Sequence, residues 1–186
     1  MRIALFFLCF FTMQLNAQDS LSVAPRFPED WSGVWSGSLN IWNAKGLSTV
    51  IPMSIDILPI DTSTTGRYTF GLIYGNKSED WRPYELVPVK PELGLWRVDE
   101  KNTIVMESYL LGPKFLCWFV VAGERSTRIL CTYERLDAET MVFEVIAGTE
   151  TTASITGNSK HEGEDIPEVK TYPVNGFQRA VLKRQK

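Results

Sequence analysis

The chain has 186 residues, of which 44% are hydrophobic and 22% are charged, and its formal net charge is −3. This length and apolar content suit one domain with its own hydrophobic core. Basic residues are not clustered among aromatic ones, so the sequence gives no sign of a nucleic-acid interface.

The N-terminus has the pattern of a secretory signal peptide, over residues 1–17. Arg2 is followed by an uncharged apolar run over residues 3–13, and Ala17 is the expected cleavage point. The run is shorter than the roughly 20 apolar residues that a membrane-spanning helix needs. We therefore expect a secreted or periplasmic protein, with no transmembrane segment in the mature chain.

A polar segment, residues 18–30, separates the signal peptide from the folded domain. It contains Pro25 and Pro28, which favour an extended backbone, so we expect a short extended lead-in.

The first strand of the domain is predicted over residues 31–42. Trp35, Leu39 and Ile41 fall on one face, and polar or small side chains alternate with them on the other. This is the period of a half-buried strand. We expect Trp35 to plug the floor of a closed barrel.

Further segments also have the composition of strands, with Gly, Pro or Asp at the breaks between them. They cover residues 47–58, 67–74, 84–89, 95–99, 103–111, 114–121, 127–136, 140–147 and 176–184. No segment shows a helical apolar period over three turns. We therefore predict an all-β domain over residues 31–186, a single antiparallel closed β-barrel of about 8–10 strands. A β-sandwich is the alternative.

One long segment of the domain is expected to lack a strand of its own. Residues 148–173 are rich in Thr, Ser, Gly, Lys and Glu, with few apolar residues. Such a composition is typical of a polar surface loop or crossover.

Two cysteines of the exported chain lie on one predicted hairpin. A register that sets Cys117 opposite Cys131 makes a cross-strand disulfide geometrically possible. Such a bond would stabilise the fold by roughly 3 kcal/mol on the chain-entropy model. Two buried free thiols are the alternative.

The first and last strands resemble those of the calycin superfamily of lipocalins, fatty-acid-binding proteins and avidins. Those barrels carry Gly-x-Trp on the first strand, matched here by Gly33-Val34-Trp35, and a basic residue on the last strand that packs across the Trp ring. The resemblance implies a calycin-like barrel of no specific family. Its basic partner for Trp35 would be Arg179, with Arg184 as the second candidate. The Thr-Asp-Tyr turn of lipocalins is absent.

The sequence offers little for catalysis or for a metal. His161 is the only histidine and lies in a strongly polar stretch, where we expect it to be solvated rather than a haem ligand. The cysteines and His161 do not have zinc-site spacing. Neither Gly-x-Ser-x-Gly nor a phosphate-binding glycine loop is found. We expect no cofactor, no metal and no catalytic residue, and a binding protein more than an enzyme.

A set of polar residues lies on strands that otherwise look buried. Charged groups are costly to bury unless they are paired, so these residues either line a ligand cavity or face the outer wall. The candidates for ligand binding are Arg82, Tyr84, Glu85, Glu107, Tyr109 and Tyr133.

We therefore expect a secreted or periplasmic β-barrel that binds a small, mainly apolar ligand in its lumen. The alternative is a protein-interaction or inhibitor-type module that acts through its surface and the 148–173 loop. An isomerase or cyclase in the lumen is a third hypothesis, since fold does not imply function. Large aromatic side chains could instead fill the interior, as in the smallest barrels.

Overall fold

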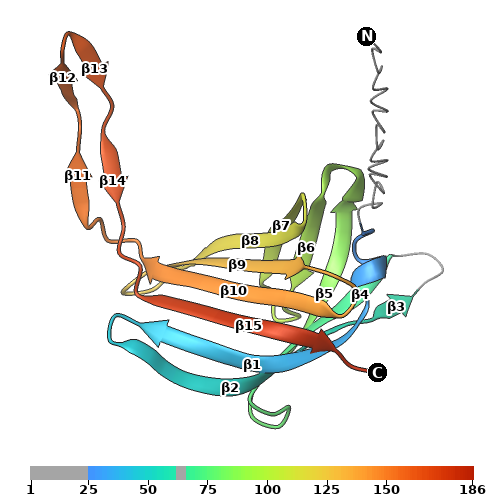
Figure 1. Cartoon of the computed structure of the whole chain (residues 1–186). Helices are drawn as coiled ribbons and strands as arrows, with labels where there is room; N and C mark the ends of the chain where they lie inside the picture. The colour runs from blue at the N-terminus through green and yellow to red at the C-terminus, as the bar shows by residue number, and fades with distance from the viewer. Residues whose placement is uncertain (1–24, 62–65) are drawn as a thin grey trace, which may run out of the picture.

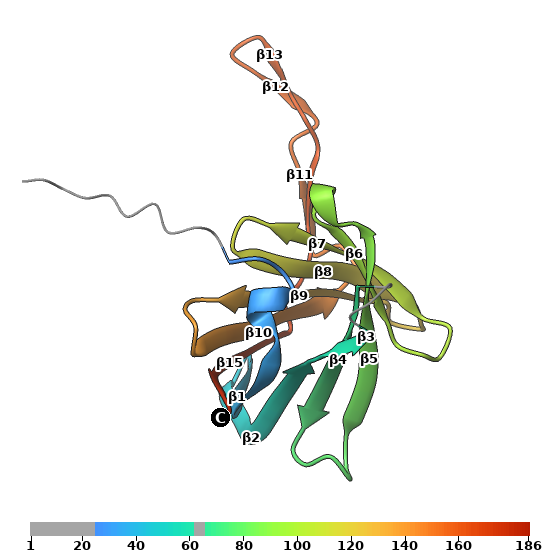
Figure 2. The same ribbon diagram turned by 90° about the vertical axis from the view of Figure 1, so that its right-hand side faces the viewer.

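The strands follow one another around a cylinder, and the sheet closes on itself (Figures 1 and 2). The computed structural model describes residues 25–61 and 66–186, so the expected signal peptide lies outside the described residues. The wall consists of β1 (Gly33–Asn43), β2 (Gly46–Ile57), β4 (Arg67–Tyr74), β5 (Trp81–Lys90), β6 (Leu95–Asp99), β7 (Val105–Leu111), β8 (Lys114–Val121), β9 (Thr127–Arg135), β10 (Thr140–Thr149) and β15 (Gly176–Arg184).

Strand pairing runs in the order β2-β1-β15-β10-β9-β8-β7-β6-β5-β4, and β4 pairs again with β2. All of these pairs are antiparallel. The last strand, β15, lies between β1 and β10, which leaves neither β1 nor β15 at an open sheet edge. The prediction of a closed antiparallel barrel is therefore confirmed, with ten strands in the wall, and the β-sandwich alternative is wrong. Short elements complete the fold: η1 (Glu29–Trp31), η2 (Pro91–Leu93) and β3 (Pro59–Asp61).

One end of the barrel is closed by a tightly packed apolar core. Alternate residues of each strand point inward, so Trp35 and Leu39 of β1 are fully buried while their neighbours reach the outer face. Trp35 lies at the closed end, as expected for a floor plug. The fully buried side chains with the largest volumes are Trp31, Trp35, Phe70, Phe115, Phe143 and Leu39.

The end of the lead-in belongs to this core and is not an extended linker. Phe27 stacks on Phe115 with a ring-centroid separation of 4.8 Å, and its edge contacts Trp31 and Trp96 at 5.1 and 5.2 Å. The short helix η1 follows and buries Trp31. Residues 25–31 thus cover the closed end, because their aromatic side chains outweigh the polar character of the surrounding sequence.

The polar segment between β10 and β15 forms a hairpin arm, not an irregular loop. It contains β11 (Ser154–Thr156) paired with β14 (Val169–Thr171), and β12 (Ser159–His161) paired with β13 (Glu164–Ile166). We call residues 150–172 the arm. It stands away from the barrel in Figures 1 and 2, and residues 153–171 are exposed. Gly148 lies at its base, where any side chain would collide with the Pro173 carbonyl oxygen.

The helices in the described part of the chain are all too short or too polar to cross a lipid bilayer.

Candidate functional site

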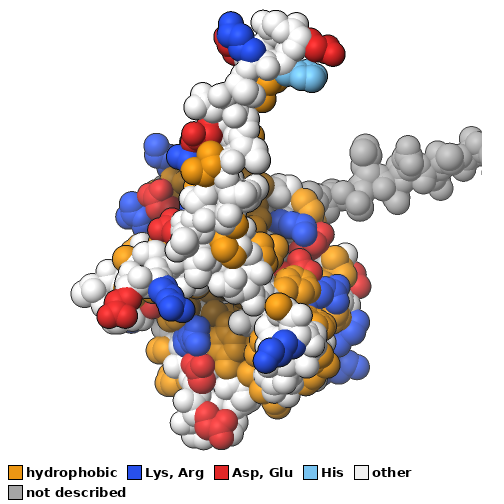
Figure 3. All heavy atoms as spheres, turned by 90° about the vertical axis from the view of Figure 1, so that its left-hand side faces the viewer, with side chains coloured by type: hydrophobic (Ala, Val, Ile, Leu, Met, Phe, Trp, Pro, Cys, Tyr) orange, Lys and Arg blue, Asp and Glu red, His pale blue; other side chains and the backbone are white. Residues whose placement is uncertain are grey.

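The barrel interior is divided into two connected chambers. The inner chamber, about 70 Å³, lies between the inward faces of β4 to β9, and the outer chamber, about 350 Å³, lies at the open end of the barrel. Tyr74, Arg82, Phe119 and Cys131 line both chambers and form the boundary between them. Figure 3 shows hydrophobic side chains within a hollow below the base of the arm. The lumen is therefore not completely filled by aromatic side chains.

Arg82 is the charged group at the boundary between the chambers. Its Nε and Nη2 atoms donate hydrogen bonds of 3.0 and 3.1 Å to the two carboxylate oxygens of Asp80. Its guanidinium also lies over the Tyr74 ring, 4.5 Å from the centroid. A planar cation held in this way has a fixed direction. Arg82 can therefore present its remaining N–H donors to the polar end of a ligand.

The tyrosines around Arg82 remain neutral at physiological pH. Burial, with the nearby Glu100 carboxylate, raises the pKa of Tyr84 to about 12. Burial also raises the pKa of Tyr74 and that of Tyr133, which is 4% exposed. Each hydroxyl can therefore donate a hydrogen bond to a ligand but does not supply a negative charge.

Both cysteines point into the lumen, and the predicted register is confirmed. Cys117 of β8 lies opposite Cys131 of β9, and both are free thiols in the structure. Burial raises the pKa of Cys131 to about 12 and raises that of Cys117 as well. Thiols in this state are weak nucleophiles, because the thiolate is the reactive form.

The structure brings together three of the six residues proposed to bind a ligand. Arg82, Tyr84 and Tyr133 line the inner chamber. Tyr74 and Phe119 also line the inner chamber, and the prediction missed both. Tyr74 could have been found, because it falls on the apolar face of its strand.

The other three proposed residues lie on the outer wall and line neither chamber. Glu85 pairs with Arg67 and with Lys101, with a distance of 2.6 Å to the Lys101 Nζ atom. Glu107 pairs with Arg97 at 3.6 Å. Tyr109 is 42% exposed and lies beside Glu107 on the same strand. Neighbouring residues of a strand face opposite sides, so Tyr84 and Glu85 cannot both point into the lumen.

The prediction that Arg179 packs across the Trp35 ring was wrong. Arg179 lies opposite Asn40 on the outer face, where its Nε atom donates to Glu144 at 3.1 Å. Arg184, the second candidate, lies opposite Trp35, with its Cζ atom 4.3 Å from the centroid of the Trp35 ring. Arg184 shares the inward phase of Ala180 and Leu182, whereas Arg179 does not.

The described residues contain no group of three or more side chains that could hold a metal ion. His161 lies at the tip of the arm, 76% exposed, with the carboxylate of Glu162 at 3.9 Å. His161 therefore belongs to no such group among the described residues.

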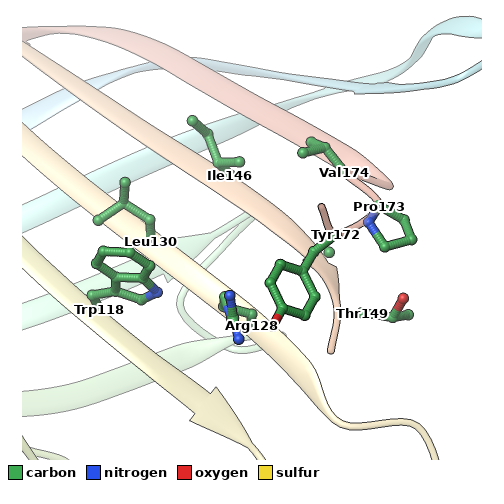
Figure 4. Close-up of a pocket in the computed structure, with 9 residues that line it drawn as sticks. Trp118, Arg128, Leu130, Ile146, Thr149, Tyr172, Pro173 and Val174 are labelled. Atoms are coloured by element: carbon green, nitrogen blue, oxygen red, sulfur yellow. The ribbon is translucent and has the colours of Figure 1, made fainter. Parts of the chain in front are cut away.

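A separate pocket lies outside the barrel at the base of the arm (Figure 4). It has a volume of about 160 Å³, and its walls include the outward-facing Trp118, Leu130 and Ile146. Arg128 lies over the Tyr172 ring, 4.2 Å from its centroid, and its Nη2 atom is 3.3 Å from the Glu150 carboxylate. These contacts attach the arm to the barrel wall.

No known family model matches this chain, and no curated protein matches it. Among solved structures, it is similar to an S-type phycobiliprotein lyase from Guillardia theta, with a TM-score of 0.51 and 12% identity, over 85% of this chain and 90% of that one. It is also similar to a protein of unknown function from the DUF3598 family of Nostoc punctiforme, with a TM-score of 0.57 and 11% identity over 84% of this chain. The match spans 48% of that Nostoc protein. At these identities the likeness concerns the fold, a calycin-like barrel.

Proposed function

We propose that this protein binds a small, mainly apolar molecule inside its barrel, and that it does so after export from the cytoplasm. The observation that carries the proposal is the pair of connected chambers, which share Tyr74, Arg82, Phe119 and Cys131. The outer chamber, at about 350 Å³, falls within the usual range for small-molecule sites of roughly 300–1,000 Å³. The likeness to a phycobiliprotein lyase is compatible with a small-molecule site in a barrel of this kind.

The chamber walls favour an apolar molecule with one polar group. The outer chamber is lined mainly by aliphatic and aromatic side chains, among them Ile51, Ile129 and Val145. Arg82, its partner Asp80 and Gln178 provide polar atoms there. A few placed polar groups in an apolar cavity fix the orientation of a bound ligand while the walls supply most of the affinity.

The native mass of the mature chain, purified without detergent and compared with its denatured mass, tests this function directly. A discrete excess that disappears on denaturation would support the proposal and give the mass of the ligand. A folded protein without such an excess, and without uptake of a fluorescent fatty-acid probe, would contradict it.

Two variants of neighbouring residues locate the binding site. Val145 is buried and lines the outer chamber, whereas Ile146 is 42% exposed on the outer wall. Val145→Trp should fill the chamber and reduce probe affinity at least tenfold. Ile146→Trp adds the same side chain outside and should leave affinity unchanged. Both variants are first compared with the unmodified protein by circular dichroism, so that a folding defect is not read as lost binding.

A second candidate function is protein binding through the arm. The observation that favours it is that residues 153–171 are exposed, with Ile155 and Val169 at least half exposed. An isolated two-stranded hairpin is marginally stable in water, so a partner that covers the arm would stabilise it. Removal of the arm should then abolish capture of the partner without unfolding the barrel.

A further inference from the structure

In the barrel wall, the pairing of β7 with β8 stops before either strand ends. Their paired residues run only from Leu111 opposite Lys114 to Ser108 opposite Cys117. Both strands continue toward the open end of the barrel, β7 back to Val105 and β8 on to Val121. If the same register continued, residues 105–107 would pair with residues 118–120. The two strands instead part, and each leaves a stretch of backbone without its neighbour on this side.

A groove occupies this gap, and we call it the slot. It has a volume of about 610 Å³, and the unpaired parts of both strands line it. Its outer rim carries exposed apolar side chains, since Val105, Trp118 and Val120 are 50%, 67% and 43% exposed, and it also includes Glu107 and Tyr109. Exposed apolar side chains around a gap in a barrel wall are typical of a surface that contacts apolar molecules.

The slot is continuous with the inner chamber. Glu100, Met106 and Phe119 line the slot, and the same three residues line the inner chamber. Met106 and Phe119 would lie opposite each other if the strands remained paired, and both point inward. Only side chains, with no backbone ladder, separate the slot from the lumen at this point. Side chains of this kind change rotamer on fast timescales, whereas a hydrogen-bonded wall does not open locally as easily.

We propose that the slot is a lateral entrance to the lumen, that Met106 and Phe119 act as its gate, and that the ligand is an elongated apolar chain. This proposal rests on the proposed function, since it concerns how the ligand of the lumen enters. The inner chamber, about 70 Å³, is far smaller than a typical site for a compact ligand. A thin chain can instead extend from the slot through the inner chamber to the outer one, with its polar end at Arg82 or in solvent.

A chemical bridge across the slot tests the proposal. Val105 and Val120 face outward and are exposed, so cysteines at these positions would react with a short bis-maleimide. The reagent is applied to Val105→Cys/Val120→Cys in a Cys117→Ser/Cys131→Ser background. The measured quantity is the rate of uptake of a fluorescent long-chain fatty-acid probe, followed by stopped flow. We expect the bridge to reduce that rate at least tenfold.

The matched control places the same bridge across strands that are fully paired. Asn40 of β1 lies opposite Val50 of β2, and the pair faces outward near the same end of the barrel. The bridged Asn40→Cys/Val50→Cys protein should take up the probe at the rate of the unbridged protein. A second control caps each single-cysteine variant, Val105→Cys or Val120→Cys, with a mono-maleimide. It distinguishes the effect of the bridge on the uptake rate from the effect of added bulk.

The gate is tested separately from the bridge. Phe119→Ala and Met106→Ala remove side chains between the slot and the chamber, so each should accelerate uptake severalfold if it remains folded. Uptake that is unaffected by the slot bridge, in a protein that still binds the probe at equilibrium, overturns the slot alone. A protein that binds the probe in none of these forms overturns both the slot and the proposed function.

Discussion

The guanidinium of Arg184 lies over the indole of Trp35, with its Cζ atom 4.3 Å from the ring centroid. The two residues stand opposite each other on β15 and β1, so the contact joins the last strand to the first. Arg184 also donates hydrogen bonds of 2.8 Å to the Asp30 carbonyl and of 2.8 Å to the Ala138 carbonyl, and it bonds the Ser32 carbonyl. One side chain thus ties together the lead-in, the floor and the turn between β9 and β10.

Replacing Arg184 should therefore weaken the closed end of the barrel. Arg184→Ala removes the cation–π contact and leaves several carbonyl groups without their donor, so we expect the free energy of unfolding to fall by about 3 kcal/mol. Arg179→Ala is the control, because Arg179 makes an exposed ion pair on the outer face and should cost less than about 1 kcal/mol. Urea unfolding followed by Trp fluorescence measures both. Equal losses would contradict a special role for Arg184.

The lead-in offers a second stability test. Phe27→Ala removes a ring that packs against Phe115, Trp31 and Trp96, and should lower the free energy of unfolding by about 2–4 kcal/mol. The neighbouring Arg26 is exposed and, among the described residues, its side chain pairs with its local partner Asp30, so Arg26→Ala should change stability by less than about 0.5 kcal/mol. If Phe27→Ala proves equally mild, residues 25–31 do not contribute to the core.

The barrel could be predicted from the sequence because the features that indicate it lie within short segments of the chain. Alternation along each strand, together with turn residues between strands, indicates many short strands, and a sheet of this size tends to close. The register of Cys117 with Cys131 followed from the length of one turn. Phe27 was missed because a single apolar residue between prolines has no periodicity that would reveal its contacts.

The site could be predicted only in part, because it depends on which phase of each strand faces the lumen. Tyr84 and Glu85 are neighbours, so at most one of them can point inward, and alternation from the buried Leu86 selects Tyr84. The same argument separates Arg184 from Arg179. The slot is different: it depends on where the pairing of two strands stops, and nothing in the local sequence of either strand marks that point.

The buried thiols predict a loss of stability at alkaline pH. Burial raises the pKa of Cys131 to about 12 and also raises that of Cys117, whereas an unfolded cysteine ionises at about pH 8.5. Above that pH the unfolded chain releases thiol protons that the folded chain retains, so the free energy of unfolding falls as pH rises toward about 12.

Serine variants isolate this contribution from other alkaline titrations. The double variant Cys117→Ser/Cys131→Ser should lose less stability than the unmodified protein between about pH 8 and pH 10, measured by urea unfolding in a reducing buffer. The tyrosines of the lumen titrate in both proteins and cancel in the comparison. Identical losses would show that the thiols are ionised to the same degree in both states.

A carboxylate of the outer wall gives a prediction about binding. Glu85 faces away from the lumen and pairs with Arg67 and Lys101, so Glu85→Gln should leave probe affinity within about twofold of the unmodified protein. Tyr84→Phe, which removes a hydroxyl that lines the inner chamber, should change it more. Fluorescence titration measures both variants. A large loss in Glu85→Gln would place the ligand outside the barrel.

The arm should be removable without loss of the barrel. Its strands pair with one another, β11 with β14 and β12 with β13, and residues 153–171 are exposed. Replacing residues 152–171 by an Asn-Gly turn keeps Arg128, Glu150 and Tyr172, whose contacts join the arm to the wall. A shorter connection costs little in loop entropy, so the free energy of unfolding should stay within about 1 kcal/mol and probe binding should be unchanged. A protein that unfolds without the arm would show that the arm supports the fold. The exposure of the hairpin would then no longer indicate a partner that covers it.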